Sequence, residues 1–391
     1  MPDSKILLGD CLIKMREMEN NSVDSIVTDP PYGISFMGKK WDYDVPSVEI
    51  WKECLRVLKP GGHLLSVCGT RTYHRMAVNI EDAGFEIRDV ISWIYGSGFP
   101  KSLNIGKAID KLEGNEREVV GYDEIARAKT KAERSRGVSN HHNFNEAHDK
   151  GRGGFVNPDE VGKITKGNSP WEGWGTALKP ACEFWALCRK PLSEKTVAKN
   201  VLKHGTGGIN VDGCRVGTEE IQIRRHKGYN SNSLVESTKG KWTGKTEKVQ
   251  GRFPSNLIHD GSEESTEGLG DSTRYFYCAK ASKKDRNEGL EGMKEKSSKK
   301  MEGGKFEFAS TTATDRIAKN NHPTVKPTPL MQYLVRLVTP PHGTVLDTFM
   351  GSGGTGKACM LEGFKFIGIE LDKDYCEIAK KRIESVPLPM L

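Results

Sequence analysis

Seven short apolar runs, each bounded by turn residues, set the strongest limit on how this chain can fold. Stretches with a helical spacing of apolar residues lie between several of them, and this alternation is typical of an α/β sheet. We therefore expect a sheet of about seven strands. The expected strands are residues 5–8, 23–28, 62–68, 87–94, 181–188, 344–347 and 366–370, and the expected helices include residues 48–58, 72–83, 328–338 and 373–383.

Two long polar stretches, residues 106–175 and 191–321, interrupt this pattern. They are rich in charge, Gly, Ser and Asn and contain only short hydrophobic pieces, so we expect insertions on a compact α/β core. Within the second stretch the sequence favours a small β-rich subdomain. The aromatic side chains expected to fill its core are those of Phe253, Tyr275, Phe276 and Tyr277.

The distribution of charge limits the kinds of partner. The chain has 59 Lys and Arg against 52 Asp and Glu, a formal net charge of +7, which suits a polyanionic partner without proving one. The basic runs KAERSRG, RRHKGY, GKWTGKTEK, KASKKDR and KEKSSKK all lie between residues 130 and 300. Basic charge is therefore concentrated in the polar middle of the chain.

Neither a membrane anchor nor a metal site is indicated. No run of roughly 18 apolar residues occurs, and the N-terminus MPDSKILLGDC lacks the charged-then-apolar order of a signal peptide. We therefore expect a cytoplasmic protein. The nine cysteines are scattered without a C-x-x-C pair, which argues against a zinc site and against a disulfide framework.

The stretch GSGGTGKA, residues 351–358, matches the phosphate-binding P-loop pattern until its last residue. A P-loop needs a hydroxyl after its lysine to hold magnesium, and Ala358 has none. The strand expected next ends at Glu370, near the spacing at which a Rossmann-like site places an acid on ribose hydroxyls. We therefore expect the glycines to admit a nucleoside rather than a triphosphate, and Lys357 to lie at the solvated start of a helix.

A second motif, DPPYG, directly follows the apolar run 23–28. Its two prolines fix the backbone and remove two hydrogen-bond donors, so the turn presents carbonyls, the Asp29 carboxylate and the Tyr32 ring in one rigid array. Asp-Pro-Pro also occurs as a simple turn. Its place directly after an apolar strand favours a functional site.

Together these motifs resemble those of the amino-group DNA methyltransferases that use S-adenosylmethionine, whose catalytic motif is [DNS]-P-P-[YFW]. The second signature of that family, D-P-F-x-G-x-G, occurs here as DTFMGSGG from Asp347, with Thr348 where proline is usual. The resemblance covers residues 5–100, 181–191 and 322–383. It implies a Rossmann-like, seven-stranded methyltransferase sheet.

The order of the motifs resembles the circularly permuted β class of that family. DPPYG comes first, and the Gly-rich strand is reached only near the end of the chain. The β class keeps its target recognition domain between the two halves, so the resemblance implies that role for residues 191–321, with residues 106–175 as the second candidate. The catalytic core then consists of residues 1–190 and 322–391.

The resemblance also implies roles for single residues. The catalytic residues are Asp29, Pro30, Pro31 and Tyr32. The cofactor-binding residues are Asp10, Lys326, Asp347, Phe349, Gly351, Gly353 and Glu370, with Gly354 beside them. Asp10 matches the position that contacts the adenine of the cofactor, although Gly-Asp also ends many strands as a helix cap.

The implied function is site-specific methylation of double-stranded DNA. Two acceptors, the Asp29 carboxylate and the Pro30 carbonyl, would free the lone pair of a base amine for attack on the methyl group, and the base would be flipped onto Tyr32. Asp at position 29 favours adenine N6, and cytosine N4 stays open. The alternatives are methylation of RNA or of a protein glutamine, and a DNA-binding module with a decayed core. The sequence does not decide between a monomer and a homodimer.

Overall fold

The computed structural model describes residues 3–34, 42–96, 98, 102–124, 127–128, 162–224, 246–267, 276–297 and 317–387. The chain divides into two compact units. One is formed by Met1–Ser97 with Ala181–Leu391, and the other by Gly98–Pro180. Among the described residues, no helix has both the length and the apolar character needed to cross a membrane.

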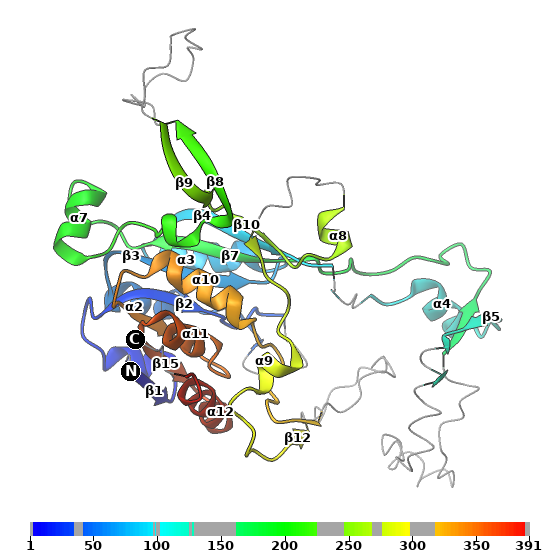
Figure 1. Cartoon of the computed structure of the whole chain (residues 1–391). Coiled ribbons are helices and arrows are strands. Elements are labelled where there is room, and N and C mark those ends of the chain that lie inside the picture. Colours follow the sequence, from blue (N-terminus) through cyan, green and yellow to red (C-terminus); the bar gives the residue numbers. More distant parts are fainter. Residues whose placement is uncertain are drawn as a thin grey trace. The chain divides into compact units, whose positions relative to one another are not determined.

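A single mixed sheet organises the first unit (Figure 1). Its strands, in spatial order, are β1 (Ser4–Leu8), β15 (Lys365–Glu370), β14 (Thr344–Asp347), β2 (Val23–Thr28), β3 (Leu58–Cys68), β7 (Cys182–Arg189), β4 (Glu86–Ile94), β10 (Leu257–His259) and β11 (Phe276–Tyr277). Neighbouring strands pair in parallel except at β7, which runs antiparallel to both β3 and β4. The predicted α/β class and all seven predicted strands are confirmed.

Helices cover both faces of this sheet. Alternate side chains of a strand point to opposite faces, and this alternation separates Ile26 and Leu64 from their neighbours Val27 and Leu65. The first face packs against α1 (Cys11–Arg16), α2 (Val48–Val57) and α3 (Tyr73–Asp82), and the second against α10 (Thr328–Val338), α11 (Gly354–Glu362) and α12 (Lys373–Glu384). The sheet is therefore buried on both sides.

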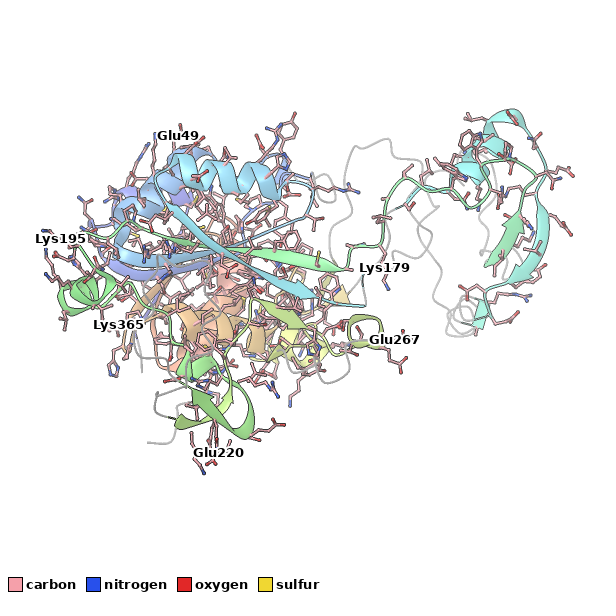
Figure 2. All side chains as sticks on the ribbon, turned by 90° about the horizontal axis from the view of Figure 1, so that it is seen from above. Glu49, Lys179, Lys195, Glu220, Glu267 and Lys365 are labelled. Atoms are coloured by element: carbon pink, nitrogen blue, oxygen red, sulfur yellow. The ribbon has the colours of Figure 1, made fainter. Side chains whose placement is uncertain are left out.

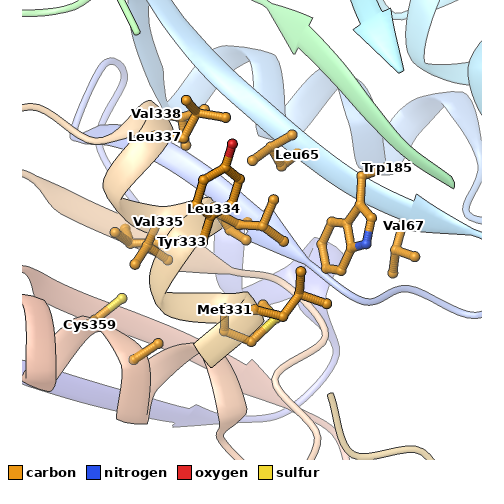
Figure 3. Packing of buried hydrophobic residues seen from close by; sticks show 14 of the residues in the cluster. Leu65, Val67, Trp185, Met331, Tyr333, Leu334, Val335, Leu337, Val338 and Cys359 are labelled. Atoms are coloured by element: carbon orange, nitrogen blue, oxygen red, sulfur yellow. The ribbon is translucent and has the colours of Figure 1, made fainter. Parts of the chain in front are cut away.

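Helix α10 packs over the centre of the sheet. Figure 3 shows Met331 and Leu334 on the same side as Leu65, Val67 and Trp185 of the strands. All five side chains are buried, and each of the four other than Trp185 contributes roughly 1.5–3 kcal/mol by leaving water. This packing fixes the segment that leads into α10, which carries Lys326.

The polar stretch 191–321 differs from the prediction. It supplies β10 and β11, which extend the main sheet to nine strands, and the helices α7 (Val197–His204), α8 (Glu263–Thr266) and α9 (Lys283–Asn287). The predicted self-contained aromatic core is wrong for Phe253 and Tyr277, which are 66% and 60% exposed. Tyr275 lies outside the described residues. The strands join the sheet because main-chain pairing with β4 is open on that side.

In the part of the chain that the structure describes, three smaller strand pairs lie outside the main sheet, two in the first unit and one in the second. The pair β8 (Val216–Arg224) and β9 (Thr246–Arg252) forms an antiparallel ribbon, and β12 (Lys296–Ser297) pairs with β13 (Ile317–Ala318). In Figure 2, the exposed Glu220 marks the outer surface of this ribbon.

The second unit is small. It contains α4 (Ile105–Glu113) and the strands β5 (Glu118–Tyr122) and β6 (Lys163–Lys166). The Arg117 guanidinium pairs with the carboxylates of Asp110 and Glu172 and so ties these elements together.

The strand order brings three strand ends together. β14 lies between β2 and β15, and all three run parallel. Parallel neighbours present their carboxyl ends at one edge, which is where ligands bind in open α/β sheets. The DPPYG turn after β2, the Gly-rich turn after β14 and Glu370 at the end of β15 therefore meet at this edge.

Candidate active site

The DPPYG turn is held in place from two sides. The buried Asp42 carboxylate accepts hydrogen bonds from the backbone N–H groups of Tyr32 (2.6 Å) and Gly33 (3.0 Å). The Thr72 hydroxyl donates to the Tyr32 carbonyl at 2.6 Å. These bonds fix the backbone that carries Asp29 and the Tyr32 ring, as expected of a preorganised site.

Four side chains meet at this turn: those of Asp29 and Tyr32, which belong to it, and those of Glu183 and Lys326. The Lys326 ammonium lies 3.0 Å from Asp29 Oδ2 and 3.1 Å from Glu183 Oε2. It also donates to the Tyr32 hydroxyl oxygen at 2.9 Å, and that hydroxyl donates to Asp29 Oδ1 at 3.1 Å. The structure thus places Lys326, predicted to bind cofactor, with its side chain on the predicted catalytic residues.

Charge and burial oppose each other in this cluster. Burial raises the pKa of Asp29, while the Lys326 ammonium lowers it. Burial lowers the pKa of Lys326, but the carboxylates of Asp29 and Glu183 outweigh that effect and hold the pKa above its ordinary value. Burial and then the Asp29 carboxylate raise the pKa of Tyr32 well above its usual range. At neutral pH the lysine is charged and the tyrosine is neutral.

The Gly-rich turn is built around the buried Asp347. Its carboxylate accepts from the Thr28 hydroxyl (2.7 Å), from the Phe349 backbone N–H (3.1 Å) and from the Thr355 hydroxyl (2.6 Å). Burial raises the pKa of Asp347 to about 6, although these hydrogen bonds lower it. Asp347 therefore joins the end of β2 to the Gly-rich turn and to α11.

The three glycines of the turn meet different surroundings. A Cβ on Gly351, whose φ is +54°, would lie 2.8 Å from His322 Nε2. A Cβ on Gly353 would lie 2.8 Å from the Ala379 Cβ of α12, so this glycine permits close helix packing. A Cβ on Gly354 would meet only the Lys326 carbonyl oxygen, at 3.9 Å. Among these three positions, Gly354 leaves its backbone most open to a ligand.

The remaining predicted cofactor residues surround the same turn. Glu370 accepts from the backbone N–H groups of Gly351 and Asp372, each at 2.8 Å, and burial raises its pKa. Phe349 is partly buried against the core. Asp10 caps α1 by accepting from the Ile13 N–H at 3.1 Å, which is the helix-cap role considered for it from the sequence.

The expectation for Lys357 is wrong. Its side chain is buried, and its ammonium pairs with Asp285 at 3.2 Å and with Glu288 at 2.7 Å. A lysine can be buried in this way only because carboxylates replace its hydration. Both partners come from the polar stretch 191–321, so the spacing within the Gly-rich motif could not reveal them.

Two residues of the site were not singled out from the sequence. Glu183 is the one acidic residue of the apolar stretch CEFWALC, and a carboxylate in such a stretch is a signal that could have been used. His322 packs its ring against Tyr375, with 4.7 Å between ring centroids. Burial, followed by the charges of Arg286 and Lys326, lowers the pKa of His322 to about 3, so the ring beside Gly351 is neutral.

Comparison with known proteins identifies one matching family. A family profile described as DNA methylase matches residues 23–149 and 182–381. The type II methyltransferase M.HinfI of Haemophilus influenzae is 30% identical over 115 residues, which are 28% of this chain and 32% of that protein. The DNA adenine methyltransferase YhdJ of Escherichia coli (strain K12) is 39% identical over 64 residues, 16% of this chain and 22% of that protein. The matched segments thus span less than a third of each relative.

Among solved structures, PvuII DNA methyltransferase, which is cytosine-N4-specific, aligns with 97% of this chain and 86% of its own. The sequence identity is 15% and the TM-score is 0.44.

We predict that Gly351→Leu abolishes binding of S-adenosylmethionine, because the new side chain must displace His322 from the turn and strains a left-handed backbone. Gly363→Leu is the matched control: Gly363 also has a positive φ, of +79°, but a Cβ there meets nothing within 4 Å. Isothermal titration calorimetry on both folded variants measures the effect. Normal affinity in Gly351→Leu would show that the cofactor lies elsewhere.

Proposed function

We propose, because this chain belongs to the DNA methylase family, that it transfers a methyl group from S-adenosylmethionine to a base amine in double-stranded DNA. One observation carries the proposal: the Thr28 hydroxyl, directly before the DPPYG turn, bonds the Asp347 carboxylate of the Gly-rich turn at 2.7 Å. The predicted acceptor of the amine and the predicted cofactor turn are therefore held together within one rigid edge.

The residues around the Gly-rich turn fit a nucleoside cofactor. The backbone at Gly354 is open to a ligand, and the Glu370 carboxylate has lone pairs left after its two backbone hydrogen bonds. Asp10 lies at the end of β1, which pairs with β15 beside Glu370. When bound, S-adenosylmethionine supplies an electrophilic methyl group on a sulfonium.

The chain's own residues prepare the amine. The lone pair of a base amine is delocalised into its ring, and acceptance of its N–H bonds by Asp29 and the Pro30 carbonyl would localise that lone pair on nitrogen. The Tyr32 ring offers a face for the flipped base, and its hydroxyl is already tied to Asp29. After transfer the nitrogen must lose a proton, and the Asp29 carboxylate, whose burial raises its pKa, is placed to accept it.

We predict that Asp29→Ala removes methyl transfer, by roughly a hundredfold or more, and leaves the affinity for S-adenosylmethionine within about twofold. The proposed role of Asp29 is confined to the target amine. Asp82→Ala, an exposed position at the end of α3, is the control and keeps full activity. Transfer of tritiated methyl groups to unmethylated DNA measures turnover. Near-normal turnover in Asp29→Ala would place amine activation elsewhere.

We propose adenine N6 as the methylated atom. The support is the residue at the start of the motif, since the family resemblance associates Asp at this position with adenine and Ser with cytosine, and position 29 is Asp. The chemistry of acceptance would serve both amines. We predict N6-methyladenine as the modified nucleoside after digestion of DNA methylated in vitro and separation by mass. N4-methylcytosine as the only product would overturn this assignment.

We further propose that residues 191–321 supply target recognition, with the β8–β9 ribbon as the reading element. A two-stranded ribbon fits the major groove of B-DNA, where each base pair presents a distinct pattern of donors and acceptors. Deletion of the whole stretch is a poor test, because it removes β10 and β11 from the sheet and both acidic partners of Lys357.

A narrower deletion avoids this damage. Val216 and Arg252 are paired across the base of the ribbon, so a short Gly-Ser linker can replace residues 217–251. We predict that this variant binds S-adenosylmethionine normally and no longer methylates a defined sequence, as read by long-read sequencing of DNA from cells that express it. Methylation of the unchanged sequence would assign recognition to residues 106–175 instead.

A further inference from the structure

The Lys326 ammonium is paired with the carboxylate that is proposed to accept the target amine. It forms ion pairs with Asp29 at 3.0 Å and with Glu183 at 3.1 Å, and it donates a hydrogen bond to the Tyr32 hydroxyl oxygen at 2.9 Å. The nitrogen also lies 5.4 Å from the centroid of the Tyr32 ring, the face proposed for the flipped base.

Both oxygens of Asp29 have a donor in this arrangement. Oδ2 accepts from Lys326, and Oδ1 accepts from the Tyr32 hydroxyl. An arriving amine must therefore displace either the Lys326 ammonium or the Tyr32 hydroxyl from Asp29. The ammonium can be displaced because it also pairs with a second carboxylate, that of Glu183. Glu183, near the beginning of β7, remains available to Lys326 when Asp29 turns to the base.

We propose that Glu183 is a positioning residue for methyl transfer: it retains the Lys326 ammonium when the Asp29 carboxylate yields its oxygen to the target amine. The proposal rests on the proposed function, in which Asp29 accepts that amine. The role proposed for Glu183 involves no contact with the base or the cofactor.

Burial explains why a second carboxylate is needed. The side chains of Asp29, Glu183 and Lys326 are 21%, 20% and 10% exposed, and removal of one partner from a buried ion pair strands the other charge. If Lys326 had Asp29 as its single carboxylate, entry of the amine would leave the ammonium without one. With Glu183 present, the lysine keeps a charged partner throughout.

The decline of turnover at acid pH, called the acid limb below, distinguishes the effect of Lys326 on Asp29 from that of Glu183. The Lys326 charge lowers the pKa of Asp29, and the Glu183 charge raises it. Ionised Asp29 is the active form, so turnover falls as the pH drops through its pKa. The titratable groups that face Asp29 are Tyr32, Cys68, Glu183, Lys326 and Asp347.

The main test is Glu183→Gln, assayed with tritiated S-adenosylmethionine and PCR-amplified bacterial genomic DNA, which carries no N6-methyladenine or N4-methylcytosine. We expect kcat/KM for this DNA to fall about tenfold, because the lysine now competes with the amine for Asp29. We expect affinity for S-adenosylmethionine to stay within about twofold, since the proposed role of Glu183 involves no contact with the cofactor. The acid limb of turnover should move to lower pH, because a charge that raises the Asp29 pKa is gone.

Lys326→Met should move the acid limb in the opposite direction, to higher pH, because the charge that lowers the Asp29 pKa is lost. Glu86→Gln is the matched control: Glu86 also forms an ion pair with β7, through Arg189 at 2.6 Å, far along the strand from Glu183. We expect this variant to keep full turnover. A purely structural role of Glu183 would lower the melting temperature without moving the acid limb.

Three outcomes would overturn the proposal. They are an unchanged kcat/KM in Glu183→Gln, acid limbs that move in the same direction in both variants, and a raised turnover in Lys326→Met. The last would show that the lysine inhibits the enzyme by blocking Asp29. Failure of the proposed function has a different signature. In that case the wild-type protein does not methylate this DNA, or Asp29→Ala retains activity.

Discussion

The hydrogen bonds of the buried Asp347 carboxylate are the contact on which the arrangement of the site depends. They join the Thr28 hydroxyl at the end of β2 to the Gly-rich turn and to Thr355 of α11, although Thr28 and Asp347 lie 319 residues apart in the chain. Without this link the two motifs would share a sheet edge but not a fixed geometry. A carboxylate suits the position because it accepts several donors at once, and these bonds offset the cost of its burial.

Much of this framework follows from the sequence, because its signals are local. The apolar runs bounded by turn residues gave Val23–Thr28 and Thr344–Asp347 with the bounds that the structure has. β10 and β11 could not be found in this way, since strands of three and two residues have no periodicity to read. Lys357 failed for a different reason. Its burial depends on Asp285 and Glu288, and a pairing so distant in sequence leaves no local pattern.

In the candidate site too, the short motifs could be predicted from the sequence and the contacts between distant residues could not. The turns that present Asp29 and the glycines are short motifs, and the structure brings them to one edge as the strand pattern implied. The position of the Lys326 ammonium depends on partners from two separate segments, namely Asp29 and Tyr32 of the DPPYG turn and Glu183 of β7. The stretch proposed for recognition is also tied to this region, since Asp285 of α9 accepts from the Thr328 N–H at 3.0 Å and Arg286 donates to the His322 carbonyl at 2.6 Å.

The reversed direction of β7 has a consequence for how such a site can be assembled. In a fully parallel sheet, only residues that follow the strands reach the ligand-binding edge. Because β7 runs the other way, Glu183 pairs with Trp93 near the end of β4. A residue at the beginning of β7 therefore lies at the edge where the neighbouring strands end. The carboxylate is thereby anchored within a hydrogen-bonded ladder rather than on a loop. One antiparallel strand thus holds a side chain rigidly at an edge where the other site residues come from turns or strand ends.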